Sequence, residues 1–427
     1  MDELAEKYNN NFLRIELLND EYTGVFRKVN ELLCIEVQID DNNKLMKIWN
    51  KSIFGMVNAV CSESPIVLLN LFARRLKGNK ITFEIDILID GFYIGKRISN
   101  KKISSFLCSY IGTDGFDLSK YYDFKPSEAT VRAICENDNY TLKTGKLTYH
   151  RTNRMSFKYN RFSFFKLNEF EFSYLKNVSM ETVLKDIWHI KNLLSIFSKK
   201  YIAVQKIELL NSKHEKADVY MNYIKKPCLI FQNEMIEHEN SRYIIKYNDI
   251  KNDFSNILKK SKMCFNEISQ IIGMYLDSME TQMPRINGFL AFCQMVEGFS
   301  REYDEQGAKI SMIKKEPKKI KNDPELKYRI YSLIKRTNFI FKLSYSRIMK
   351  VAEKISKGRN YYTHNNKSQK IYELSYNELS QFRCFLEDVL LANIYLQIGI
   401  SKEIIFNSLN GSFYYDINRI SWNTLNS

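Results

Sequence analysis

Apolar and polar side chains alternate along much of the chain between about residue 10 and residue 175. Two runs show the alternation most clearly: Leu33, Ile35, Val37 and Ile39, and then Ile81, Phe83, Ile85 and Ile87. A period of two is typical of strands that bury one face. The pattern therefore predicts a β-rich N-terminal region.

One turn signal stands out in this region. Asp90-Gly91 follows the second run, and Phe92-Tyr93-Ile94 comes next. Because Asp-Gly between apolar runs favours a tight hairpin turn, we expect the strand to reverse there. Further aromatic-rich strands are expected between Tyr140 and Phe172. The run from Pro65 to Lys77 fits either a buried strand or a short helix, since periodicity does not distinguish them.

Near residue 180 the apolar spacing changes to three and four residues. Met180 to Lys199 has this spacing and is predicted to be an amphipathic helix. Two strand-like segments follow, Ile202 to Leu210 and Tyr220 to Phe231. Together these segments predict a β-rich N-terminal domain over residues 1–240, with one helix near residues 180–199.

Helical spacing dominates from residue 248 onward. It predicts helices that begin near Phe254, Pro284, Glu325 and Ser375, with a polar connection from Asp304 to Pro324. The last helix has the plainest ends, because Ser375-Tyr376-Asn377-Glu378 is a capping box and Gly399 is a residue type that stops helices. Short connections between four or five helices predict an all-α antiparallel bundle over residues 245–427. The predicted fold class is α+β.

The charge of the chain is compatible with nucleic-acid binding. The formal net charge is +15 and the pI is about 9.2, and lysines and arginines release counterions from a phosphate backbone. The chain is also rich in Lys, Asn and Ile throughout, which would give the same balance without any nucleic-acid partner. Charge alone therefore leaves RNA binding open.

Lysines concentrate between residues 309 and 321, within the polar connection. They are Lys309, Lys314, Lys315, Lys318, Lys319 and Lys321, against the single acid Glu316. Such a run fits a loop that follows RNA phosphates, but more often it is a solvated loop. The candidate RNA-binding residues are Lys314, Lys315, Lys318 and Lys319.

Several other classes of protein are disfavoured. The charged N-terminus lacks the apolar core of a secretory signal, and the apolar stretch from Val389 to Ile400 contains Asn393 and Gln397 and is too short for a membrane span. We therefore expect a cytoplasmic protein with no membrane partner. Eight cysteines are scattered singly, with no zinc-ligand spacing, so we expect no metal and no cofactor.

The stretch from Gly358 to Asn366 carries the candidate chemistry. It places Arg359 and Asn360 close to His364, the one histidine of five that follows an arginine with four to six residues between them. Arginine is a permanent cation that braces a phosphate at two points, and histidine transfers protons near neutral pH. The three residues predict a ribonuclease site that needs no metal.

Helix geometry restricts how this site is assembled. Residues 359 and 364 lie about 140° apart around a regular helix, so their side chains do not share a face. Either the helix unwinds after Arg359, with Asn365-Asn366 as its end, or two copies of the motif meet across a dimer. The two explanations do not exclude each other.

Three further residues are candidate supporting groups. Glu297, on the second predicted bundle helix, either pairs with Arg359 or faces solvent. Tyr361 and Tyr362 either stack on the bases of single-stranded RNA or pack in the core or a dimer. Trp188 and His189, within the predicted helix from Met180 to Lys199, are interpreted as packing residues.

The motif resembles the R-x(4–6)-H signature of the HEPN superfamily, in which the residue after Arg is usually polar and often Asn. The helix from Phe289 to Glu297, the segment from Leu390 to Ile400 and the β-rich region with its Asp-Gly turn resemble ApeA-type anti-phage proteins. Those proteins pair an ApeA-like N-terminal domain with a C-terminal HEPN domain. The resemblance extends over nearly the whole chain.

This resemblance implies a role for each motif residue. His364 would act as general base or acid on the ribose 2′-OH and the leaving 5′-oxygen, Arg359 would stabilise the charged transition state, and Asn360 would orient the phosphate or the histidine. The products would be a 2′,3′-cyclic phosphate and a 5′-hydroxyl. The family also implies a homodimer through the HEPN domain, with higher oligomers left open.

The leading hypothesis is a metal-independent HEPN endoribonuclease of an abortive-infection defence. It would cleave host or phage RNA, with transfer RNA loops as one candidate, while the N-terminal domain senses a phage protein trigger or restrains the nuclease. The alternative is a non-catalytic HEPN module for dimerisation or RNA binding, joined to a β-rich domain that binds a protein or glycan. A metal-dependent enzyme is a third and weaker hypothesis.

Overall fold

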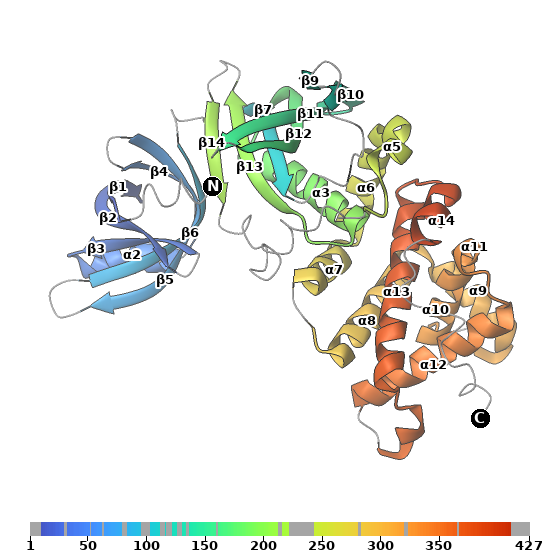
Figure 1. Ribbon diagram of the computed structural model, residues 1–427. Helices are drawn as coiled ribbons and strands as arrows, with labels where there is room; N and C mark the ends of the chain where they lie inside the picture. The colour runs from blue at the N-terminus through green and yellow to red at the C-terminus, as the bar shows by residue number, and fades with distance from the viewer. Residues whose placement is uncertain are drawn as a thin grey trace. The chain divides into compact units, whose positions relative to one another are not determined.

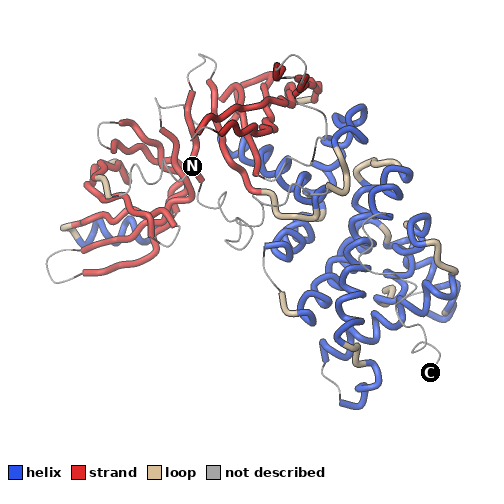
Figure 2. The backbone as a smooth tube through the Cα atoms, viewed as in Figure 1, coloured by secondary structure: helices blue, strands red, loops and turns tan. Residues whose placement is uncertain are grey.

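The computed structural model of the chain describes residues 10–29, 32–51, 53–61, 64–78, 83–94, 103–111, 116, 122–125, 130–133, 136–158, 161–211, 216–221, 243–280, 283–319, 323–364 and 367–410. The chain forms two compact units. The first contains Met1–Asp114, Ser119–Lys191 and Ile202–Glu237, and the second contains Gly115–Leu118, Asn192–Tyr201 and His238–Ser427. Strands dominate the first unit and helices the second (Figures 1 and 2). The predicted α+β class is confirmed, whereas the domain boundary at residues 240–245 stays a prediction.

Six antiparallel strands form a closed ring in the first unit. They are β1 (Phe12–Leu17), β2 (Asp20–Val29), β3 (Leu32–Ile39), β4 (Ile53–Cys61), β5 (Ser64–Gly78) and β6 (Phe83–Ile94). The order β6-β3-β2-β1-β4-β5 is closed by pairing of β5 with β6. Alternate side chains point into a core that includes Ile15, Phe26 and Ile35, all fully buried. This burial is the physical origin of the two-residue period.

A helix that the sequence analysis did not predict follows β3. It is α2 (Asn42–Lys51), which buries only Leu45 and Ile48 against the ring. Asp41 caps it, because the carboxylate accepts a hydrogen bond from the Asn43 backbone N–H at 2.7 Å. Two buried positions in ten residues were too few to give a clear helical period.

An open antiparallel sheet continues from β6 in the order β14-β13-β7-β12-β11-β10. Its strands are β7 (Ile103–Ile111), β10 (Glu136–Leu142), β11 (Gly145–Lys158), β12 (Arg161–Val178), β13 (Ala203–Asn211) and β14 (Lys216–Met221). Two short strands, β8 (Tyr122–Lys125) and β9 (Thr130–Ala133), pair separately. The predicted amphipathic helix is confirmed as α3 (Met180–Ser198). It contacts this sheet where the Tyr110 hydroxyl donates to the Ile187 carbonyl at 3.1 Å.

The predicted hairpin at Asp90-Gly91 is wrong. Strand β6 runs through these two residues without a turn, and Gly91 pairs with Leu69 on one side and Met221 on the other. A strand hydrogen-bonded on both edges overrides a local turn preference, because pairing satisfies every backbone group of the segment. The ring instead has a tight turn at Leu18-Asn19, where both residues adopt positive φ.

Two other predicted segments form strands, at least in the residues that the structure describes. The run from Pro65 to Lys77 lies within β5 and is therefore a strand. Of the predicted strand from Tyr220 to Phe231, the first two residues end β14, and the others lie outside the described residues.

The second unit is helical. Its helices are α5 (Tyr247–Ile250), α6 (Phe254–Glu267), α7 (Ser269–Glu280), α8 (Arg285–Tyr303), α9 (Glu305–Lys315), α10 (Leu326–Arg336), α11 (Asn338–Phe341), α12 (Tyr345–His364), α13 (Tyr376–Gln397) and α14 (Lys402–Asn410). Helix α13 is buried along most of its length, with α8 and α10 packed against it (Figure 1). Its predicted ends are confirmed by the Ser375/Glu378 capping box and by Gly399 at φ 93°. No helix in the described ranges is long and apolar enough to cross a membrane.

Two predicted segments of this unit differ from the structure. The helix expected from Glu325 to Lys357 is divided into α10, α11 and the start of α12, with a left-handed Lys342 between the last two. The Asn338 side chain bonds the backbone N–H and C=O of Leu343 at 2.9 Å each and fixes this break. The connection expected from Asp304 to Pro324 is largely helix α9, because its buried residues Ala308 and Met312 provide a helical apolar face.

We predict that Asp388→Ala lowers the free energy of unfolding of the second unit by about 3 to 5 kcal/mol. Asp388 on α13 is buried and forms an ion pair with Lys199, which is itself largely buried, so the substitution leaves a desolvated ammonium without its partner. The double variant Asp388→Ala with Lys199→Met removes both charges and should recover much of the loss. Urea unfolding of the full chain tests this, and an unchanged midpoint for the single variant would contradict it.

Candidate active site

The predicted motif occupies the last two turns of α12. Gly358 precedes it at a buried position where a Cβ would lie 2.7 Å from Cδ1 of Leu374. Leu374 belongs to the segment that returns toward α13 and is itself buried. Glycine is therefore required because the returning segment passes directly against the helix backbone.

Tyr362 ties the helix end to the same segment. Its hydroxyl donates to the Leu374 carbonyl at 2.9 Å and accepts from the Leu374 N–H at 3.1 Å. Its ring packs edge-on against Phe289 of α8, with the centroids 6.4 Å apart, and against Tyr361 at 5.0 Å. Tyr362 therefore has a packing role in this structure, while Tyr361 is half-buried beside it.

A charged contact one turn earlier strengthens the connection between α12 and α13. The Lys354 ammonium lies 2.5 Å from Glu378, the acid of the capping box, and both side chains are mostly buried. Burial raises the pKa of the Glu378 carboxyl, but hydrogen bonds from Lys354 and from the Ser375 backbone and hydroxyl outweigh it, so the pKa is lowered. One carboxylate thus caps α13 and holds α12 beside it.

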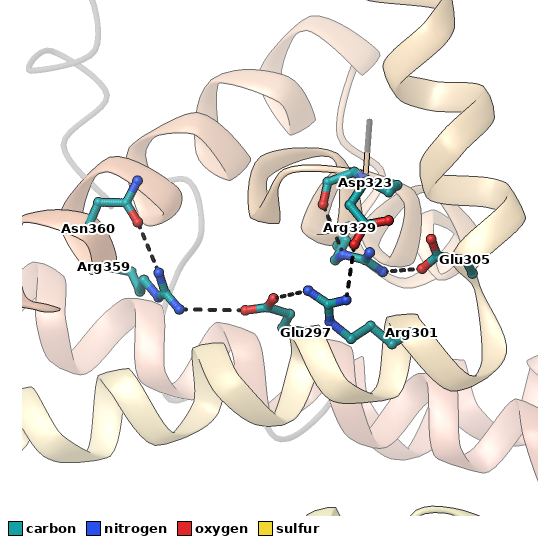
Figure 3. Close-up of polar contacts among 8 residues, drawn as sticks. Glu297, Arg301, Glu305, Asp323, Arg329, Arg359 and Asn360 are labelled. Carbon is teal, nitrogen blue, oxygen red and sulfur yellow. Dashed lines mark hydrogen bonds and ion pairs between the residues drawn. The ribbon is translucent and has the colours of Figure 1, made fainter. Parts of the chain in front are cut away.

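Arg359 faces α8 and enters a chain of ion pairs (Figure 3). Its Nη2 lies 3.7 Å from Glu297, and Nη1 donates to Oδ1 of Asn360 at 3.2 Å. Glu297 also accepts from Arg301 at 2.8 Å, and Arg301 lies 3.8 Å from Asp323. The structure thus brings Glu297 and Arg359 together, with about a third of the arginine side chain still exposed.

A buried thiol lies in the electrostatic field of the same arginine. Cys293 lies one turn before Glu297 on α8 and is 1% exposed. Burial raises the pKa of the Cys293 thiol, although the positive charge of Arg359 opposes that rise. The thiol therefore stays protonated and serves as packing.

His364 is the last residue of α12 and is exposed. The helix stays regular from Arg359 to His364, so unwinding after Arg359, the first of the two explanations left open, does not occur in this structure. Among the described contacts, no hydrogen bond or ion pair joins these two side chains. Asn360 and His364 are four residues apart on neighbouring turns of one exposed face. A single copy therefore presents the motif residues on two adjacent faces.

The candidate RNA-binding lysines lie in ordered secondary structure. Lys314 and Lys315 end α9 and are exposed, and Lys318 is exposed in a short 3-10 helix, Pro317–Lys319. The side chain of Lys319 lies outside the described residues. Their role in RNA binding stays a prediction.

Two members of the ion-pair chain were not identified from the sequence. Arg301 follows Glu297 by four residues on α8, and this spacing is a readable signal for a helix pair. Asp323 has no such signal, because the contact depends on how the segment before α10 folds back toward α8.

We predict that Gly358→Ala lowers the free energy of unfolding by about 1 to 3 kcal/mol, because the new methyl group overlaps Leu374. Gly273→Ala in α7 is the matched control, since a Cβ there meets nothing within 4 Å. The control should instead stabilise by up to about 1 kcal/mol, the gain in helix propensity. Thermal unfolding of both variants measures the difference, and equal effects would contradict the close packing.

Two protein-family models match separate stretches of the chain. The family model described as ApeA N-terminal domain 1 matches residues 52–260, and that described as Apea-like HEPN matches residues 290–404, a range that contains Glu297 and the whole Arg359 to His364 motif. The comparisons with curated proteins and with solved structures found no match. The two domains point to an anti-phage HEPN-containing protein, and the chain has the architecture of an ApeA-type protein with a C-terminal HEPN domain.

Proposed function

We propose that the chain is an endoribonuclease of anti-phage defence that uses its HEPN domain to cleave RNA. HEPN domains are usually ribonucleases. The observation that carries the proposal is the environment of Arg359: Glu297 holds its guanidinium on one side, about a third of the side chain is still exposed, and the exposed Asn360 and His364 follow it on the same helix end. A cation held in this way is positioned to bind a phosphodiester.

The proposed reaction is transfer of the phosphodiester to the neighbouring 2′-oxygen. His364 removes the proton of the ribose 2′-OH, the 2′-oxygen bonds to phosphorus, and the bond from phosphorus to the 5′-oxygen breaks. A protonated histidine supplies the proton to the leaving 5′-oxygen. Arg359 stabilises the added negative charge on the phosphoryl oxygens, and Asn360 orients the phosphate or the histidine. The chemistry itself calls for no metal.

A dimer would complete this site. HEPN domains typically dimerise, and the unbroken α12 directs Arg359 and His364 about 140° apart. A second copy that faces the end of α12 would bring its own His364 toward Arg359, so that one histidine acts as base and the other as acid. One copy then holds half a site, and higher assemblies remain compatible with it.

The β-rich unit is proposed to control this activity. Uncontrolled RNA cleavage would damage the host, so a nuclease of abortive infection requires restraint until a phage protein or another phage cue is present. The cytoplasm is the proposed location, because RNA of host and phage is available there. Transfer RNA is a proposed substrate, since its loops expose unpaired bases.

We predict that His364→Ala and Arg359→Ala each lower RNA cleavage by at least about 100-fold, because each removes a group that acts on the transition state. The control is Lys350→Ala, an exposed lysine on the same helix. The assay incubates the full chain with cellular RNA in EDTA and identifies 2′,3′-cyclic phosphate ends.

Three outcomes of this assay would contradict the proposal in different ways. Cleavage that survives either motif substitution would reject the assigned roles. Loss of wild-type cleavage in EDTA would indicate a metal-dependent enzyme. If induced expression of the wild type in cells exposed to phage harms those cells no more than expression of His364→Ala does, a non-catalytic HEPN module is favoured.

We predict that Glu297→Gln lowers kcat by about 10- to 100-fold with little change in KM, because Arg359 loses the charge that sets its position. Arg301→Ala is the matched control: it contacts the same carboxylate, but its side chain is half exposed. Its effect on kcat should stay below about fivefold, since exposed ion pairs contribute at most about 1 kcal/mol. Steady-state kinetics measures both, and equal losses would contradict a specific role for Glu297.

A further inference from the structure

Two arginines on neighbouring helices have guanidinium groups that lie over aromatic rings. Arg285 begins α8, and its Cζ is 3.0 Å from the ring centroid of Tyr376, which begins α13. Arg383 of α13 lies over Phe292 of α8, with its Cζ 5.8 Å from the ring centroid. No described residue forms an ion pair with either arginine. Two cations in this part of the structure are therefore stacked without being neutralised.

The packing of α8 against α13 brings Arg383 close. Its side chain passes Gly288, where a Cβ would lie 3.3 Å from the Arg383 Cδ. Of the acids near Arg383 on α13, Glu387 accepts from the Tyr275 hydroxyl at 2.9 Å, and Glu378 is bonded to Lys354 and Ser375. The positive charge of the two arginines is thus left available to an external anion.

This surface adjoins the candidate active site. Arg285 is one helical turn, or about 6 Å along the axis, from Phe289, and Phe289 packs on Tyr362 of the motif helix. On α13, Tyr376 lies two residues after Leu374, whose backbone binds the Tyr362 hydroxyl. The connection between α12 and α13, at the lowest end of the helical unit in Figure 1, therefore joins this surface to the end of α12.

The chemistry of the three groups suits a single-stranded nucleic acid. A guanidinium stacked on a ring keeps its N–H edge free, and that edge can donate two parallel hydrogen bonds to a phosphate. Tyr376 is 64% exposed, so its ring is accessible to a nucleotide base. Alternation of stacking surfaces and cations is how proteins hold unpaired strands.

We propose that Arg285, Tyr376 and Arg383 form a binding surface for single-stranded RNA, in which the arginines contact phosphates and the tyrosine stacks on a base next to the scissile nucleotides. This inference deepens the proposed function and rests on it. In this proposal, residues near the start of α8 and α13 bind the substrate, and the motif residues of α12 act on the reacting atoms.

The test measures binding without cleavage. A fluorescent single-stranded RNA oligonucleotide with 2′-O-methyl riboses lacks the reacting hydroxyl, so anisotropy reports the affinity of the intact full chain. Arg285→Ala with Arg383→Ala is expected to raise Kd at least tenfold and to reduce the slope of log K against log salt by about 1.4, or roughly 0.7 for each phosphate that is no longer neutralised. Tyr376→Ala should raise Kd at least about fivefold.

The control removes equal charge elsewhere. Lys259→Ala with Lys350→Ala deletes two exposed lysines on α6 and α12 and should change Kd less than twofold. Arg285→Lys with Arg383→Lys keeps the charge but loses the planar stack, so it should recover the salt slope more than the affinity. On cleavable RNA, the arginine double variant should raise KM and leave kcat unchanged.

Two results would overturn the inference. The first is an equal Kd for Arg285→Ala with Arg383→Ala and for the control, Lys259→Ala with Lys350→Ala. The second is a changed oligomeric state in sedimentation at unchanged RNA affinity, which would make the surface a protein interface. The proposed function fails separately, since it is lost if His364→Ala cleaves as wild type does, whatever the uncleavable RNA shows.

Discussion

The close contact between the end of α12 and Leu374 is the constraint on which the candidate site depends. Helix ends lack backbone partners and tend to fray, yet the last two turns of α12 stay regular through the motif to His364. A glycine that lets the chain pass closely, and a tyrosine hydroxyl that satisfies both backbone groups of Leu374, hold these turns in place. Each hydrogen bond contributes only about 1 kcal/mol, but together they fix where Arg359 meets α8.

Local patterns predicted those parts of the fold that local physics controls. The period of two along β3 and β6 and the capping box of α13 each depend on residues close in sequence, and both were predicted. Asp90-Gly91 shows the limit, because partners on both edges of β6 decide its conformation. The division of the helix expected after Glu325 likewise depends on one side-chain contact, from Asn338 to Leu343.

In the candidate site, too, the features that depend on neighbouring residues were predicted and those that depend on distant residues were not. Arg359, Asn360 and His364 were identified because their spacing lies within one short segment. The continuation of the helix to His364 was not predicted. It depends on the hydrogen bond from the Tyr362 hydroxyl to Leu374, a residue that comes later in the chain. The stacking of Arg285 on Tyr376 was also missed, because it requires knowing that α8 and α13 begin side by side.

Helix α3 limits how this chain can be divided. Its residues from Asn192 onward belong to the helical unit, where the Ile196 carbonyl accepts a hydrogen bond from Tyr395 and Lys199 pairs with Asp388. A fragment that begins at residue 245 would lose both partners and expose the buried side of α13. The compact helical unit is therefore discontinuous in sequence. The activity of a fragment that lacks residues 192–201 would reflect the loss of these core contacts as well as the loss of the β-rich unit.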